Sequence, residues 1–158
     1  MSKIIPHLWY TDKAEEAAAF YASVLPSSKV DSVTVLPADT PSGPSGSVKV
    51  VEFTLMGQQF MAISAGPLDA FNHSISFLVL CDEQAEIDRI WGALSEGGAT
   101  ERCGWLKDRY GLSWQIAPTV LGKMMKDPDR VRAKRVAQAM LKMVKLDIAG
   151  LQKAYEGG

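Results

Sequence analysis

Few side chains in this sequence are chemically reactive and also set within apolar segments. The two histidines are His7, inside one short apolar run, and His73, just ahead of another. An imidazole there can hydrogen-bond a ligand or act as a general base; the alternative is a hydrogen-bonded core or interface residue. Cys81 and Cys103 form no CxxC pair, and no sequence neighbour supplies Cys103 with a base, which favours structural thiols. Gln115 can orient a polar ligand or serve as a satisfied core amide.

Large apolar side chains accompany these polar groups. Trp9 is expected to share a strand face with His7, and two further tryptophans flank Gln115 and the turn after Cys103. Their rings can stack on a flat ligand or pack in a core or dimer interface. Phe53 and Met61 allow the same two interpretations. We therefore assign no catalytic residue and take eight residues as candidates for the lining of a ligand cavity: His7, Trp9, Phe53, Met61, Cys103, Trp105, Trp114 and Gln115.

Charge and composition argue against several function classes. The net charge of −1 and the pI of about 6.1 give no electrostatic case for binding nucleic acid. No apolar run approaches the roughly 18 residues of a membrane span, and residues 1–10 lack the pattern of a signal peptide. We therefore expect a cytoplasmic protein with free thiols, no membrane contact and no nucleic-acid partner.

The candidate residues lie on a predicted strand–helix–strand series. Ile4 to Tyr10 is short, apolar and aromatic, as expected for a strand. Asp12 is placed to cap a helix that stops at Pro26. Three strands then follow, at residues 30–36, 48–55 and 59–64, with a Pro/Gly/Ser-rich loop at 37–47 and a hairpin turn at 56–58.

The same series then repeats. Asp12 matches Asp82 and Phe20 matches Ile90, a constant offset of 70 residues in the printed numbering. Asp108 is expected to brace the turn between the last two strands. The repeated elements are a strand at 74–81, a helix from Asp82 to Gly97-Gly98, and strands at 100–106 and 112–117. This pattern predicts a duplicated βαβββ unit, whose sheet carries a helix on one face and leaves a concave surface on the other.

The remaining residues predict a helical tail outside the repeat. Asp127-Pro128 is interpreted as one helix start and Asp147 as the cap of a last helix. The inward-facing residues are expected to be Val131, Val136, Met140, Met143, Val144, Ile148, Leu151 and Tyr155. The predicted division is a first module at 1–66, a second at 67–118 and a tail at 119–158, all within one compact domain.

Motifs in the second repeat resemble those of a known family. They include Gly66-Pro67, Phe71-Asn72, Ser74 to Phe77 and Cys81-Asp82. The run from Cys103 to Ile116 that follows is similar as well, and Pro118 closes it. Together they resemble the PhnB-like family of the glyoxalase/bleomycin-resistance/dioxygenase (vicinal oxygen chelate) superfamily.

That resemblance implies an α+β fold of two tandem βαβββ modules with a C-terminal helical extension, and a homodimer. The family has also been labelled 3-demethylubiquinone-9 3-methyltransferase. Methyl transfer is not expected, because the sequence has no Gly-rich turn of the kind that binds S-adenosylmethionine.

The resemblance also implies where a metal would be held. Enzymes of the superfamily use a His, Gln or Glu on the first and last strand of each module. Projection onto this sequence gives Ile5, Ile75, Met61 and Gln115, of which only Gln115 can ligate. His7 and His73 are the only nearby alternatives, and no carboxylate is expected on either final strand. We therefore expect no metal and no cofactor.

The resulting hypothesis is a metal-independent small-molecule-binding protein whose ligand is not specified by the sequence. The alternative is a metal-dependent enzyme of the glyoxalase or dioxygenase type, a lyase or oxidoreductase, which recruits a metal through His7, Gln115 and ligand atoms. A second alternative is a structural or partner-binding dimer whose cavity is filled by side chains.

Overall fold

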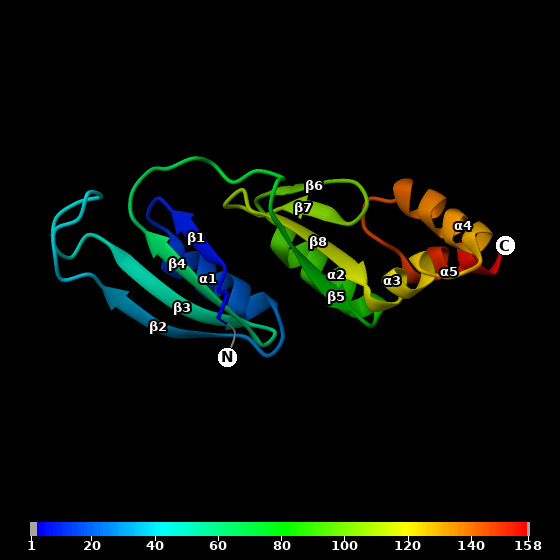
Figure 1. The fold of residues 1–158 in the computed structure, drawn as a ribbon, viewed down its shortest axis with the longest axis horizontal. Helices are drawn as coiled ribbons and strands as arrows, with labels where there is room; N and C mark the ends of the chain where they lie inside the picture. Colours follow the sequence, from blue (N-terminus) through cyan, green and yellow to red (C-terminus); the bar gives the residue numbers. More distant parts are fainter. Residues whose placement is uncertain (1–2, 158) are drawn as a thin grey trace. The chain divides into compact units, whose positions relative to one another are not determined.

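The computed structural model describes residues 3–157 and separates into two compact units, Met1–Ala70 and Phe71–Gly158 (Figure 1). Each unit contains one four-stranded mixed sheet, and each is described by itself. The α+β class predicted from the sequence is confirmed. Within residues 3–157, no helix combines the length and hydropathy needed to cross a membrane.

The first unit is a βαβββ module. Its elements are β1 (His7–Tyr10), α1 (Ala14–Val24), β2 (Lys29–Val35), β3 (Lys49–Leu55) and β4 (Gln58–Ser64). The strand order is β1-β4-β3-β2, with β1 and β4 parallel and the other neighbours antiparallel. The hairpin predicted between β3 and β4 is present, but its turn is Met56 and Gly57, with φ values of 49° and 86°, and Gln58 already belongs to β4.

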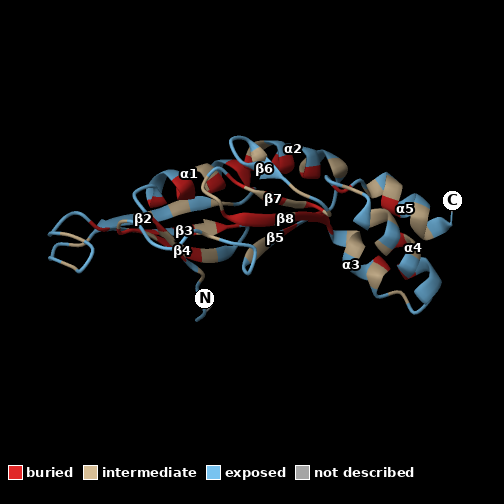
Figure 2. Ribbon diagram, turned by 90° about the horizontal axis from the view of Figure 1, so that it is seen from above, coloured by how far each residue is buried: buried red, intermediate tan, exposed pale blue. Residues whose placement is uncertain are grey.

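The second unit repeats this topology. Its sheet contains β5 (Ser76–Cys81), β6 (Ala99–Thr100), β7 (Trp105–Lys107) and β8 (Ser113–Pro118), in the order β5-β8-β7-β6. The helix α2 (Gln84–Ser95) buries Ile87, Ile90, Trp91 and Leu94 against it. β8 is buried along almost its whole length (Figure 2). Both units contain a first strand, a helix and three further antiparallel strands in the same order. The predicted duplication is therefore confirmed.

The predicted caps of the first two helices are wrong. The residues at the N-cap positions are Lys13 and Glu83, and neither side chain caps its helix. In α1, the hydroxyl of Ser64 on β4 accepts a hydrogen bond from the amide of Ala14 at 2.9 Å. A side chain from the sheet thus satisfies an amide that a local cap would otherwise serve.

The tail contains three helices where the sequence predicted two. They are α3 (Thr119–Met125), α4 (Arg130–Leu141) and α5 (Ile148–Glu156), and they share a small core of Met124, Val136 and Leu151. Two further details of the prediction are wrong. Asp129, not Asp127, caps α4 and accepts hydrogen bonds from two amides of its first turn. Val131 and Val144 are exposed, at 64% and 44%, instead of facing inward.

Residues 142–147, between α4 and α5, attach the tail to the second unit. We call this segment the strap. The amides of Cys103 and Gly104 donate to the carbonyls of Met143 and Val144, at 2.9 and 2.8 Å. On the α2 side, the Gln84 amide side chain bonds the main chain at both Leu146 and Ile148. Lys145 pairs with Asp88 at 2.8 Å. The ammonium of Lys145, followed by the Gln84 donor, holds the pKa of the Asp88 carboxyl below its usual value.

Candidate functional site

One face of the first sheet points away from α1, and we call it the open face. It carries a row of side chains that crosses all four strands. His7 is in register with Met61, Met61 with Glu52, and Glu52 with Ser32. Residues in register across neighbouring strands point to the same side of a sheet. His7 and Glu52 are exposed, whereas their strand neighbours Leu8 and Phe53 are buried beneath α1. Two of the cavity candidates, His7 and Met61, therefore share this face with a carboxylate that sequence reasoning missed.

An open hollow of about 380 Å³ is lined by Glu52 and Met61 of this row, but not by His7 or Ser32. Ser32 donates a hydrogen bond to Glu52 at 2.7 Å, and Thr54 donates to Asp31 at the same distance. Lys29 is 3.6 Å from Asp31. The lining is therefore richer in hydrogen-bond acceptors than the mostly apolar cavity candidates predicted in this unit. Its residues are Ile5, Lys29, Asp31, Glu52, Phe53, Thr54, Gln59, Phe60 and Met61.

Trp9 and Phe53, the other candidates in this unit, differ in position. Trp9 is half-buried beside His7 on the open face, and its indole donates to the carbonyl of Gly66 at 2.8 Å. Phe53 borders the hollow, but its side chain is 1% exposed and stacks on Phe60 with ring centroids 5.4 Å apart. Trp9 is thus the more accessible ring, and Phe53 serves mainly the core.

The open face of the second sheet carries a corresponding row. Trp105 is in register with Gln115, and Gln115 with Leu78. The Gln115 amide donates to the hydroxyl of Ser76 at 3.0 Å, which fixes its orientation. Leu78 is 55% exposed, and Leu80, further along the same strand face, is 49% exposed. This face therefore combines an apolar surface, an indole and one oriented amide.

Trp114 does not belong to this open face. It is 2% exposed, lies on the α2 side in register with Phe77, and donates its indole N–H to Asp108 at 2.9 Å. Asp108, itself 2% exposed, also accepts from the amides of Tyr110 and Leu112. The prediction that Asp108 braces this hairpin is confirmed. Trp114 is a core residue because adjacent strand residues point to opposite faces.

Neither cysteine is placed for nucleophilic chemistry. Cys103 sits in a turn with φ of 60°, and its amide is bound to the strap. Cys81 is fully buried on the α2 side of β5. Burial, followed by a hydrogen bond to Glu86 and the charge of that carboxylate, raises the pKa of the Cys81 thiol to about 12. Cys81 is therefore a neutral thiol near neutral pH.

The donor set does not fit the metal that the superfamily implies. Ile5 and Ile75 offer no Lewis base, and Gln115, whose amide nitrogen donates to Ser76, offers a single oxygen. His73 lies outside β5, where its Nε2 contacts Glu101 at 2.9 Å. Across residues 3–157, no group of three or more His, Cys, Asp and Glu side chains is placed to hold an ion.

The tandem βαβββ units with open sheet faces have the fold of glyoxalase/bleomycin-resistance proteins. More specifically, the chain belongs to the family described as 3-demethylubiquinone-9 3-methyltransferase, whose model matches residues 2–117. The tail beyond residue 117 lies outside that match. Among curated proteins no significant match was found.

Solved structures agree with this assignment. A PhnB protein from Bacillus cereus, described as a putative 3-demethylubiquinone-9 3-methyltransferase, is 33% identical. The match covers 75% of this chain and all of that one, with a TM-score of 0.67. A glyoxylase/bleomycin resistance protein/dioxygenase domain from Frankia is 13% identical, covering 73% and 96%, with a TM-score of 0.50. The fosfomycin resistance protein FosX from Listeria monocytogenes is 12% identical, covering 80% and 98%, with a TM-score of 0.56. The last two show the fold alone.

Proposed function

We propose that this protein binds a small, partly apolar molecule on its open sheet faces without a metal ion. The observation that carries the proposal is the row Trp105, Gln115 and Leu78, where an accessible indole and an exposed leucine flank one oriented amide. Ligand sites typically combine apolar walls with a few fixed polar groups in this way. Contiguous exposed apolar surface can mark a binding site, and Leu78 and Leu80, both exposed on one face of β5, support the same proposal.

We also propose that the protein works as a homodimer and that its modules are 1–66 and 67–118, followed by the tail at 119–158. Methyl transfer is not part of the proposal, because no Gly-rich turn follows a first parallel strand in either unit.

A metal-dependent enzyme is the second candidate, and one observation favours it. His7 and Glu52 stand in the same open-face row on β1 and β3, with β4 between them. Strands two apart are separated by roughly 10 Å, a span that a histidine and a glutamate can bridge through a shared ion. Both side chains project from the open face, so a ligand that supplies further oxygens would complete the coordination.

A thermal-shift screen tests the leading proposal. A molecule that binds only the folded state raises the melting temperature through linkage. The screen should find at least one metabolite that stabilises the metal-free protein, and Gln115→Leu should reduce that shift. Gln138→Leu, an exposed site on α4, is the matched control and should leave the shift unchanged. If no compound raises the melting temperature, the binding proposal is refuted, and the purely structural dimer takes its place.

Metal analysis separates the two candidates. Mass spectrometry of the purified protein, followed by titration with Zn²⁺, Mn²⁺ or Ni²⁺, should show no stoichiometric binding. Tight binding of one ion per chain that Glu52→Gln or His7→Ala abolishes would instead establish the second candidate.

A further inference from the structure

The tail creates a second, separate hollow in the Phe71–Gly158 unit. It has a volume of about 620 Å³, within the range of small-molecule sites. Leu80 at the end of β5, Gly122 on α3, and Pro128 give it apolar walls, while Tyr155 of α5 closes another side. Because α3 and α5 lie beyond residue 117, the family match includes only Leu80 of this hollow.

Two lysines supply its charge. Lys123 and Lys126 are three residues apart on and just after α3, and both line the hollow. Within residues 3–157, neither ammonium has a carboxylate within ion-pair distance. Thr119 adds a hydroxyl at the start of the same helix. The lining therefore presents two ammonium groups without a direct ion pair beside an apolar wall, and with one carboxylate it has a net charge of +1.

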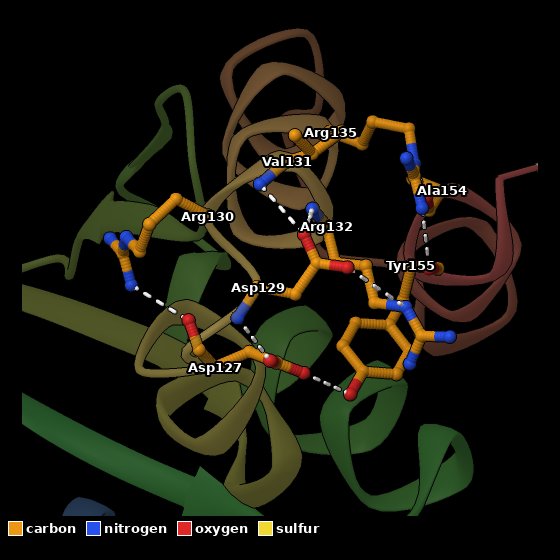
Figure 3. A network of polar contacts seen from close by, with 8 residues as sticks. All are labelled: Asp127, Asp129, Arg130, Val131, Arg132, Arg135, Ala154 and Tyr155. Carbon is orange, nitrogen blue, oxygen red and sulfur yellow. Dashed lines mark hydrogen bonds and ion pairs between the residues drawn. The ribbon is translucent and has the colours of Figure 1, made fainter.

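The one carboxylate in the lining, Asp127, is already occupied by other donors. The hydroxyl of Tyr155 donates to one of its oxygens, and the amide of Asp129 donates to the other at 2.8 Å (Figure 3). These hydrogen bonds, the Tyr155 one first, hold the pKa of Asp127 below its usual value. The Arg132 guanidinium lies over the Tyr155 ring, 5.1 Å from its centroid. Asp127 therefore positions the Tyr155 wall, and its carboxylate stays ionised and offsets one of the two lysine charges.

The wider surroundings are also positive. Residues 119–158 contain nine Lys and Arg against four Asp and Glu, although the whole chain has a net charge of −1. A cationic neighbourhood raises the local concentration of anions and disfavours cations. The tail thus has the electrostatic character that an anion site needs.

We propose that this hollow binds an amphipathic organic carboxylate. The carboxylate lies between the Lys123 and Lys126 ammoniums, and the aliphatic chain lies against Leu80, Pro128 and the Tyr155 ring. The hollow shares Leu80 with the second open face but contains none of Trp105, Gln115 and Leu78, and the proposal does not depend on the proposed function.

Octanoate is the probe, and its binding is measured by isothermal titration calorimetry and by the chemical shifts of backbone amides. Octanoate should bind saturably and shift the amides of Gly122 to Asp127. Lys123→Met and Lys126→Met should each weaken binding about tenfold, as expected for loss of one charge-assisted contact. Lys134→Met removes an exposed charge on α4 outside the hollow and is the matched control, expected to leave binding unchanged.

Octylamine and two arginine variants make the test independent of folding defects. Octylamine has the same chain but a positive charge, so it should not shift these amides. Lys123→Arg and Lys126→Arg keep the charge and should bind octanoate within about threefold of the original protein. The proposal is overturned if octanoate leaves the Gly122 to Asp127 amides unshifted, if octylamine shifts them equally, or if the methionine variants bind as well as the arginine variants.

Discussion

Asp108→Ala should be among the most destabilising single substitutions in the second unit. The Asp108 carboxylate is buried and accepts from the amides of Tyr110 and Leu112 and from the indole of Trp114, at 2.8, 3.1 and 2.9 Å. A hydrogen bond to a charged acceptor contributes about 1.5–3 kcal/mol, and a buried donor left unpaired has a similar cost. Tyr110 is half-buried and water can replace part of its bond. We therefore expect a loss of about 4 kcal/mol.

Urea unfolding followed by tryptophan fluorescence measures this loss, because Trp114 reports directly on the braced hairpin. Asp12→Ala is the control, since this exposed carboxylate accepts no hydrogen bond within residues 3–157 and should change stability by less than about 0.5 kcal/mol. Asp108→Asn should lose about half as much as Asp108→Ala, because one oxygen remains. In a Trp114→Phe background, the loss of unfolding free energy caused by Asp108→Asn should be smaller still. A loss below about 1 kcal/mol for Asp108→Ala would refute the assigned role.

Three further outcomes follow from the same structure. Gly98→Ala should destabilise the protein by about 3 kcal/mol, because the new Cβ would lie 2.0 Å from the Lys107 carbonyl oxygen. Gly92→Ala in α2 meets nothing within 4 Å and should stabilise the protein by about 1 kcal/mol. Urea unfolding measures both changes. Stability should fall by about 1 kcal/mol between pH 9 and pH 10, since the unfolded Cys81 thiol ionises first while the folded pKa is about 12; Cys81→Ala should remove this slope. Tyr155→Phe should raise the pKa of Asp127 in an NMR titration, since it removes the main donor, and stability at low pH should then depend less on that group.

Local patterns in the sequence were sufficient to predict the elements and their duplication. Strand alternation, turn residues and buried helix stripes repeat, so both βαβββ units were predictable. The cap of α1 was not, because its hydrogen-bond partner, Ser64, lies 50 residues away from Ala14 in the chain. α3 was missed because seven residues with a central glycine give too short a periodic signal.

The candidate site was predicted less completely. Strand parity alone places Trp114 and Gln115 on opposite faces, so one of the two had to be core, and the register shows that it is Trp114. Glu52 was not predicted because the projected ligand positions all lie on the first and last strand of each module, whereas Glu52 lies on β3. Its alternation with buried Val51 and Phe53 was the available signal that it faces outward.

The strap gives the tail an unusual kind of tolerance to sequence drift. Two of its hydrogen bonds, from Cys103 and Gly104, end on main-chain carbonyls that every residue type possesses. Substitutions at Met143 or Val144 therefore leave these two hydrogen bonds in place. Shortening the chain before them would leave the amides of Cys103 and Gly104 without acceptors and would expose Leu146, which is buried beside Gly104. The attachment of the tail therefore depends on the number of residues between Cys103 and Met143 more than on the side chains at 143 and 144.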